Sequence, residues 1–284
     1  MKRRLSIYHI YAIPTTAYLL LFFYIPIITI IVYSFWIGGP FYEFKPGFTL
    51  ENYVRFLTSR VTQNVMIVTN VVAFLSFLAT LLVAYPIAYF LARVLKGDTG
   101  LRIILLMLIP LEMNYLIRIF AWRNILGEQG FINNLLLTLG IIDEPVRIFF
   151  HSMYAVIIVI VHNALPYAVF PLYITLRSIP QNLYQAAMDL GSNRVSTFFR
   201  VTLPLSMPGI AVAFLFIYVP MLGEFAIPAL VGGKTFLLGN LITRQYLDVG
   251  NWPYASAATI SLLIITLIAS FLVFKYMGVR RLYE

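Results

Sequence analysis

The chain has 284 residues, 61% hydrophobic and 11% charged, with a mean hydropathy of +0.88. Soluble domains are about half apolar and about a quarter charged, so this composition excludes a soluble enzyme or nucleic-acid-binding domain and predicts a polytopic membrane protein. The absence of cysteine excludes disulfides and thiolate metal sites, and the net charge of +9 is expected to set membrane topology rather than to bind nucleic acid.

Six apolar segments are each long enough to cross a bilayer core of about 30 Å, which needs about 20 helical residues. They cover residues 10–35, 65–90, 103–121, 155–176, 208–230 and 255–274. Backbone groups in lipid must bond within their own segment, so these spans are helices. The sequence therefore predicts an all-α, polytopic bundle of six transmembrane helices.

The start of the chain resembles a signal peptide, because three basic residues, Lys2, Arg3 and Arg4, precede an apolar run. That run is longer than the core of a cleaved signal, and no small-residue cleavage site follows it. We expect a retained first helix.

The distribution of basic residues predicts the orientation. Twelve of the 20 Lys and Arg residues lie at the termini and in the loops of one side, seven lie on the other side, and Arg118 lies within or near the third span. Cytoplasmic loops carry the excess of positive charge. Both termini and the loop 177–204 are thus predicted to be cytoplasmic.

Two segments on the predicted outer side are long. Residues 37–64 are mixed polar and aromatic, and residues 123–154 contain an amphipathic pattern around 131–139 that Gly140 closes. A lid or a receptor-docking surface competes here with passive packing.

The cytoplasmic loop 177–204 has the pattern of a polar helix–turn–helix. Ser178 and Gln181 have capping-box spacing, and Gly191 is placed to end a first helix over 181–190. Lipid does not stabilise such a shape, so the loop either docks a soluble partner or is a structured loop without one.

A second short helix is expected to follow in the same loop. Ser192 or Asn193 can cap a helix over 194–201, which is predicted to stop before Pro204.

The spacing of this loop resembles the EAA loop, E-A-A-x3-G-x9-I-x-L-P, of permease subunits of ABC importers. The matching positions, with Gln for Glu and Val for Ile, are Gln185, Ala186, Ala187, Gly191, Val201, Leu203 and Pro204. In that family the loop is a coupling helix that sits in a cleft of an ATPase subunit. The resemblance therefore implies coupling to an ATPase by Gln185, Ala186, Ala187, Asp189, Gly191, Leu203 and Pro204.

Further stretches are similar to the permeases of spermidine/putrescine importers. They are Phe48-Thr49-Leu50-Glu51-Asn52-Tyr53, Ile117-Arg118-Ile119, residues 223–233, Gly239-Asn240 and Asn251-Trp252-Pro253. The resemblance implies a type I importer in the bacterial inner membrane, with two different permease chains, an ATPase dimer and an extracytoplasmic solute receptor. ATP and Mg would bind to the ATPase, and this chain would hold no cofactor.

On this resemblance the chain divides into three parts. Residues 1–63 form the first helix and its outer segment, residues 64–276 form the permease core with the coupling loop, and residues 277–284 form a cytoplasmic tail.

Ionisable groups in or beside spans are candidates for the substrate pathway, because charge in the membrane is costly. Glu224 lies where Gly223 and Pro228 predict a broken helix. A carboxylate facing a cationic substrate competes with a structural ion pair, for example with Arg118. The candidate pathway residues are Glu224, Glu112, Tyr115, Trp252 and Asp248, the aromatic ones as cation–π surfaces.

An ABC permease for a different small solute remains an alternative, and so do two other classes of protein. A stand-alone transporter coupled to protons or sodium would use Glu112, Glu224 or His162 and would need no ATPase. An intramembrane enzyme lacks a nucleophile–base set or a metal-ligand set in this sequence, so no catalytic or metal-binding residue is predicted.

Overall fold

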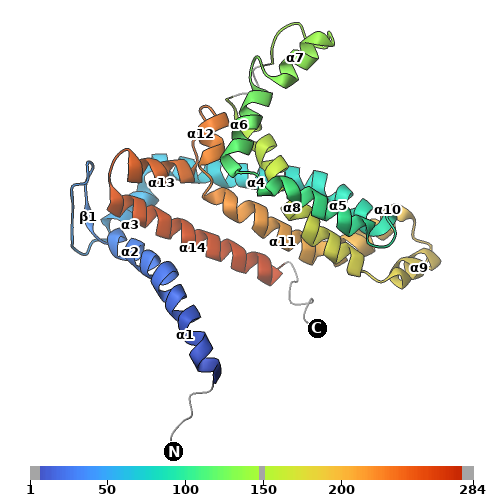
Figure 1. Cartoon of the computed structure of the whole chain (residues 1–284), viewed down its shortest axis with the longest axis horizontal. Coiled ribbons are helices and arrows are strands. Elements are labelled where there is room, and N and C mark those ends of the chain that lie inside the picture. The colour runs from blue at the N-terminus through green and yellow to red at the C-terminus, as the bar shows by residue number, and fades with distance from the viewer. Residues whose placement is uncertain (1–6, 147–150, 277–284) are drawn as a thin grey trace, which may run out of the picture. The chain divides into compact units, whose positions relative to one another are not determined.

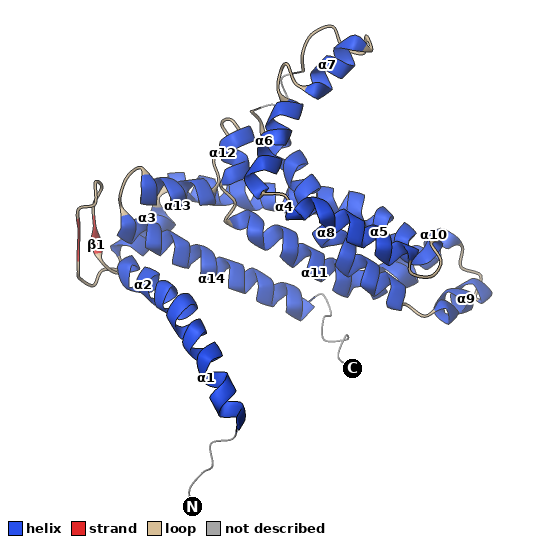
Figure 2. Ribbon diagram, viewed as in Figure 1, coloured by secondary structure: helices blue, strands red, loops and turns tan. Residues whose placement is uncertain are grey.

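The computed structural model describes residues 7–146 and 151–276, and most of the described chain is helical (Figure 2). The chain divides into two compact units, Met1–Gln63 with Leu241–Ile264, and Asn64–Asn240 with Ile265–Glu284. The predicted tail 277–284 lies outside the described residues, and so do the basic residues at the start of the chain.

The first unit begins with one long helix and continues through a small hairpin. The helix consists of α1 (Ile7–Leu19), a π turn η1 (Leu20–Tyr24) and α2 (Ile25–Ser34). Strands β1 (Ile37–Gly38) and β2 (Phe44–Lys45) pair antiparallel, and α3 (Glu51–Thr58) follows. This hairpin is a minor departure from the predicted all-α fold.

Asn52 joins α3 to the end of α2. Its side-chain amide is buried and donates to the carbonyls of Ser34 at 3.1 Å and of Trp36 at 2.9 Å, while the Tyr53 hydroxyl donates to Ser34 Oγ at 2.6 Å. A buried amide that satisfies two carbonyls stabilises a loop, because each group would otherwise lose its hydrogen bonds to water.

The remaining helices start with α4, which begins in the first unit and extends through the second. In chain order they are α4 (Arg60–Tyr89), the π turn η2 (Phe90–Val94), α5 (Thr99–Leu108), the 3₁₀ turn η3 (Ile109–Glu112), α6 (Tyr115–Leu126), α7 (Phe131–Thr138), α8 (Met153–Ser178), α9 (Gln181–Asp189), α10 (Arg194–Thr197), the π turn η5 (Phe198–Thr202), α11 (Leu203–Leu222), α12 (Ala226–Val231), α13 (Leu238–Leu247) and α14 (Trp252–Tyr276).

The core of the second unit is the packed pair α8 and α11, which lie side by side in Figure 1. A Cβ atom at Gly209 of α11 would come within 2.7 Å of Thr175 Oγ1 and 3.0 Å of the Pro171 carbonyl oxygen on α8. Only glycine fits here. Small residues at such contacts let helix backbones approach closely, which is how helices associate when lipid replaces water.

Five helices within the described residues are long and apolar enough to span a membrane: Ile13–Ser34, Arg60–Val94, Met153–Ser178, Arg194–Leu222 and Trp252–Tyr276. They correspond to the predicted first, second, fourth, fifth and sixth spans.

The predicted third span is not the single helix that its apolar run indicates. The pair Thr99–Glu112 and Tyr115–Thr138 passes the same test together but is bent by 91° at its break. Pro110 brings the chain into a 3₁₀ turn, and the Asn114 side chain then caps α6, accepting from Leu116 N at 2.9 Å. A proline followed by a strong N-cap residue ends one helix and begins another.

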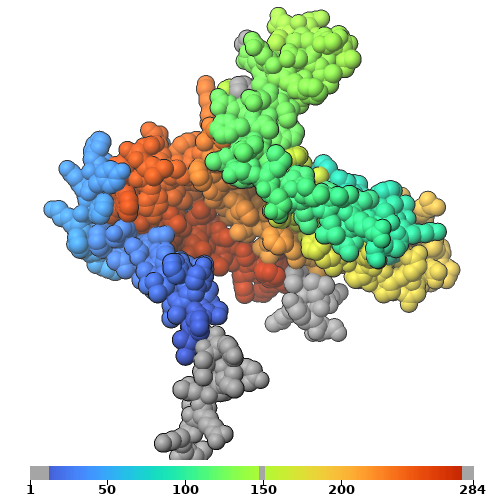
Figure 3. All heavy atoms as spheres, in the orientation of Figure 1, coloured from blue at the N-terminus to red at the C-terminus, as the bar shows by residue number. Residues whose placement is uncertain are grey.

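The short helix α7 lies where the sequence predicted an amphipathic helix, and Gly140 ends it with φ +66°. In Figure 3 α7 (green) stands away from the rest of its unit. Its side chains Phe131, Leu135 and Leu139 are exposed.

Candidate functional site

The loop helix α9 ends as the sequence predicted. Gly191 has φ +81°, Gly191 N donates to the Met188 carbonyl at 2.8 Å, and Ser192 N donates to the Ala187 carbonyl at 3.0 Å. These two bonds are a Schellman motif, which satisfies carbonyls that the helix end leaves open. Because glycine alone adopts this φ without strain, Gly191 sets the direction in which the chain leaves α9.

The start of α9 differs from the prediction. Ser178 does not cap it, because its hydroxyl donates back to the Thr175 carbonyl at 2.8 Å and Pro180 occupies the N-cap position. The hydroxyl of a serine in the last turn of a helix can donate to a carbonyl of the preceding turn. Here this bond forms instead of the capping box.

The second loop helix starts as predicted but does not stop before Pro204. Asn193 Oδ1 accepts from Ser196 N at 2.8 Å, and the helix then continues unbroken from Arg194 to Leu222. The π turn η5 directly precedes α11, with the bond from Leu203 N to the Phe198 carbonyl, and Pro204 falls in the first turn of α11. Pro204 lies just after the π turn, where the regular i→i−4 hydrogen bonding is already interrupted, so its missing N–H does not end this helix.

The surface of α9 is open to solvent in this structure. None of its residues is buried, and the apolar side chains Leu183, Met188 and Leu190 are exposed. Gln185, Ala186 and Asp189 are also exposed, and Ala187 is half-buried. Leu203 and Pro204 lie instead within the long helix, so the structure separates them from the exposed helix that carries the other predicted coupling residues.

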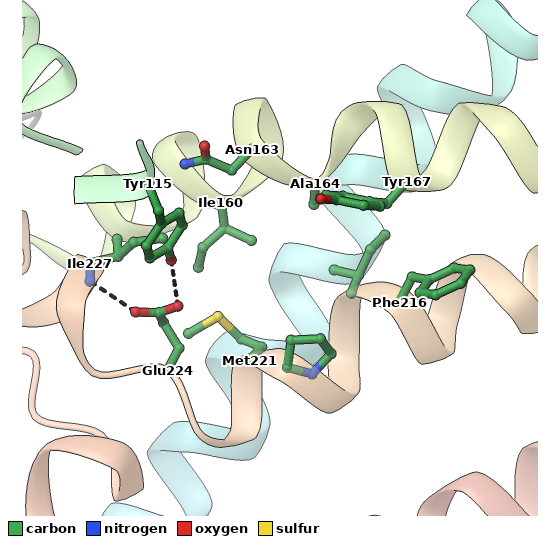
Figure 4. Close-up of a pocket in the computed structure, with 11 residues that line it drawn as sticks. Tyr115, Ile160, Asn163, Ala164, Tyr167, Phe216, Met221, Glu224 and Ile227 are labelled. Carbon is green, nitrogen blue, oxygen red and sulfur yellow. Dashed lines mark hydrogen bonds between the residues drawn. The ribbon is translucent and has the colours of Figure 1, made fainter. Parts of the chain in front are cut away.

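A pocket of about 290 Å³ lies in the second unit between α6, α8, α11 and α12. Figure 4 shows its lining, which is mainly apolar and aromatic: Tyr115, Ile160, Asn163, Ala164, Tyr167, Phe216, Ile217, Pro220, Met221, Glu224 and Ile227. Among these residues Glu224 is the one with a charged side chain at neutral pH. The pocket is thus lined by aromatic rings and by one carboxylate.

Glu224 lies in the helix break that the sequence predicted, between Leu222, where α11 ends, and Ala226, where α12 begins. Its Oε1 accepts from Ala226 N at 2.7 Å and from Ile227 N at 3.0 Å. The carboxylate therefore caps α12, where backbone N–H groups favour a negative charge.

The second carboxylate oxygen of Glu224 faces α6. The Tyr115 hydroxyl donates to Glu224 Oε2 at 2.5 Å, and the two side chains point toward one another in Figure 4. The sequence offered Arg118 as an ion-pair partner of Glu224. Its guanidinium carbon lies 5.7 Å from the centre of the Tyr115 ring. Among the described residues the partners of Glu224 are thus a hydroxyl and backbone amides, which leave its charge unneutralised.

Asn163 supplies a second acceptor at the pocket. It is 8% exposed, its Nδ2 donates to the Val159 carbonyl at 2.9 Å, and its Oδ1 has no hydrogen-bond partner among the described residues. A buried carbonyl oxygen without a partner is costly.

The other predicted pathway residues do not line this pocket. Glu112 is exposed at the bend between η3 and α6. Trp252 and Asp248 belong to the first unit, where the Trp252 ring stacks on Phe44 with 6.1 Å between centroids and Asp248 is exposed after α13. His162 packs edge-on against Trp122, 5.1 Å between centroids.

Sequence reasoning missed two of the aromatic residues that line the pocket, Tyr167 and Phe216. They come from α8 and α11, and their rings lie 6.3 Å apart. The only signal in the sequence is an aromatic residue in each of two apolar spans, and the chain has 23 Phe and 19 Tyr in all.

Comparisons with known proteins agree with this architecture. Residues 4–278 match the family described as binding-protein-dependent transport system inner membrane component. The spermidine/putrescine transport system permease protein PotB of Salmonella typhimurium (strain SL1344) is 36% identical over 93% of this chain and 92% of its own length. PotB of Escherichia coli (strain K12) is 37% identical over 89% of this chain and 91% of its own length.

A solved structure shares the fold. The crystal structure of a bacterial alginate ABC transporter in complex with an alginate pentasaccharide-bound periplasmic protein contains a chain that aligns with a TM-score of 0.73 and 18% identity, over 95% of this chain and 94% of that one. The match covers nearly the whole length of both chains. This protein therefore belongs to the family of inner membrane components of binding-protein-dependent transport systems.

Proposed function

We propose that this chain is a transmembrane permease subunit of an ATP-driven importer for polyamines of the spermidine/putrescine class. The observation that carries the proposal is the 36% identity to PotB over more than nine-tenths of both chains. Such coverage leaves no room for a different membrane architecture in either protein. The fold alone does not choose the solute, because the alginate transporter has the same fold.

The chemistry of the pocket supports a cationic solute. A polyamine carries ammonium groups, which bind to carboxylates and to the faces of aromatic rings. The pocket offers the Glu224 carboxylate and the rings of Tyr115, Tyr167 and Phe216. All of its polar side-chain oxygens can accept a hydrogen bond, and an ammonium group only donates.

In this proposal α9 docks on a separate ATPase subunit. Its exposed apolar side chains and the small residues Ala186 and Ala187 provide a surface that a cleft can cover. Gln185, Asp189 and Gly191 set the polar contacts and the exit direction, while Leu203 and Pro204 connect the docked helix to α11. ATP and Mg bind to the ATPase, so this chain needs no cofactor.

The driving force must come from ATP. A ligand shifts a conformational equilibrium only by its differential affinity for the two states, so ATP that binds the closed ATPase dimer more tightly drives the permease between its outward- and inward-facing forms. The full assembly that we propose has a second homologous permease chain, an ATPase dimer and an extracytoplasmic binding protein. α9 and both termini face the cytoplasm.

The test starts with purification of a tagged copy from native membranes and identification of the bound proteins. Copurification of an ATPase and a second permease supports the proposal. The complex is then reconstituted in proteoliposomes with receptor, ATP and labelled spermidine. Uptake by this chain alone, driven by a proton or sodium gradient, overturns the proposal in favour of a secondary transporter. ATP-driven uptake of another solute overturns the polyamine assignment and keeps the importer.

A further inference from the structure

The loop helix α9 is weakly held by its own packing. It has no buried residue, and its two ends are single chain connections, through Ile179 and Pro180 to α8 and through Gly191 to α10. A helix without buried residues gains little stability from packing, so contacts with neighbouring elements decide how firmly it is held. If an ATPase displaces α9, a further point of attachment is needed to move the rest of the chain, because coupling travels through elements whose relative positions are fixed.

Arg93 provides that attachment from the end of α4. It lies in the π turn η2, where its Nη1 donates to the Ile179 carbonyl at 3.1 Å and its Nη2 donates to Gln181 Oε1 at 3.1 Å. One guanidinium therefore holds both the connection between α8 and α9, at Ile179, and the first residue of α9, Gln181. The planar fork of arginine suits two acceptors at once, whereas the ammonium of lysine is a single point.

Tyr184 completes the contact one turn further along α9. The Arg93 guanidinium carbon lies 4.0 Å from the centre of the Tyr184 ring, well within the reach of a cation–π contact. The Tyr184 hydroxyl is 3.5 Å from Thr202 Oγ1 in η5. The ring thus lies between the end of α4 and the start of α11.

We infer that Arg93 is a positioning residue for transport, which locks α9 to α4 so that a displacement of α9 moves α4, α8 and α11 together. The inference rests on the proposed function, since it needs an ATPase that displaces α9. It assigns a role outside the docking surface, because the side chain of Arg93 is directed to α9 of its own chain.

The experiment measures coupling and structure in the same assembled complex. In proteoliposomes with receptor and spermidine, polyamine transported per ATP hydrolysed is compared for wild type, Arg93→Ala, Arg93→Lys, Tyr184→Leu and Tyr184→Phe. Arg93→Ala is expected to lower this ratio about tenfold, within the usual range of coupling between sites, while ATP hydrolysis continues. Arg93→Lys should keep part of the wild-type ratio. Tyr184→Phe, which keeps the ring, should keep more of this ratio than Tyr184→Leu.

Hydrogen exchange provides a readout that transport does not affect. In Arg93→Ala the amides of α9 should exchange about tenfold faster, because the opening free energy of a local segment sets its protection, with α8 and α11 unchanged. The control is Arg102→Ala, an exposed arginine on neighbouring α5, which should alter neither readout.

The outcomes separate this inference from the proposed function. Unchanged coupling or unchanged α9 exchange in Arg93→Ala, in a complex that contains the ATPase, overturns the role of Arg93 alone. A wild-type chain that binds no ATPase overturns the proposed function and the coupling role with it. Loss of coupling together with faster α9 exchange supports the inference.

Discussion

Tyr115 and Glu224, 109 residues apart in sequence, share a hydrogen bond of 2.5 Å that joins α6 to the break between α11 and α12. The same carboxylate caps α12 through two backbone amides. The bond is therefore both a structural link and the polar centre of the pocket, and the two roles can be separated by substitution.

Glu224→Gln removes the charge and keeps an oxygen that can still cap α12. We expect uptake of spermidine to weaken about tenfold or more, since a hydrogen bond to a charged group contributes about 1.5–3 kcal/mol, with normal assembly of the complex. Initial uptake rates against spermidine concentration measure this. Glu43→Gln is the matched control, because Glu43 is an exposed carboxylate of the first unit that does not line the pocket and was not predicted for the pathway. Equal uptake by wild type and Glu224→Gln would remove Glu224 from the pathway.

Tyr115→Phe removes the hydroxyl and keeps the ring. Glu224 Oε2 then loses its donor while Oε1 keeps its two amides, so we expect a smaller loss of uptake than for Glu224→Gln, about fivefold for one hydrogen bond of about 1 kcal/mol. Tyr115→Leu also removes the cation–π surface and should lose more. If Phe and Leu behave alike, the ring does not contact the solute.

Gly191→Val should uncouple transport without preventing membrane insertion. A β-branched residue at φ +81° costs about 1–2 kcal/mol and redirects the chain after α9. We expect receptor-stimulated ATP hydrolysis to be lost. Gly97→Val is the control: Gly97 also has a left-handed φ, +63°, no side chain or distant backbone lies within 4 Å of the Cβ position of either glycine, and Gly97 lies outside the loop that carries α9. Its variant should keep stimulation, and loss in both would indicate general destabilisation.

The natural absence of cysteine allows a direct test of orientation. Leu190 is 87% exposed at the end of α9, and Ile141 is 64% exposed after α7. In single-cysteine variants, a membrane-impermeant thiol reagent should label Leu190→Cys only in inside-out vesicles and Ile141→Cys only in intact spheroplasts. The reverse pattern would place α9 outside the cell and would contradict docking on an ATPase.

The length of the apolar segments was sufficient to predict five spans, because every helix that crosses a membrane must have an apolar segment of that length. The bend before Asn114 was not predicted, because the residues on both sides of it are apolar. The sequence therefore reads as one span, although one helix ends at Pro110 and Asn114 caps a new one. Pro204 was misinterpreted for the opposite reason. A single proline indicates a helix end, but the chain admits it in the first turn after a π turn.

Local signals located the polar loop and the helix break at Glu224, because Gly191, Gly223 and Pro228 act on their immediate neighbours. The contacts that these features make were not predictable. Arg93 reaches Gln181 over 88 residues and Tyr115 reaches Glu224 over 109, and each pair depends on how helices pack rather than on any spacing in the sequence. The prediction for Asp248, Trp252 and Glu112 as pathway residues stays a prediction.

The unbroken helix from Arg194 to Leu222 has 29 residues, which at 1.5 Å per residue is a strut about 40 Å long. The helix begins directly after Asn193, in the loop that carries α9, and ends at Leu222, two residues before Glu224. It contains the π turn η5 and the prolines Pro204, Pro208 and Pro220, which are the features at which helices bend. A displacement imposed at Asn193 would therefore reach Leu222 as a tilt combined with bending at these points.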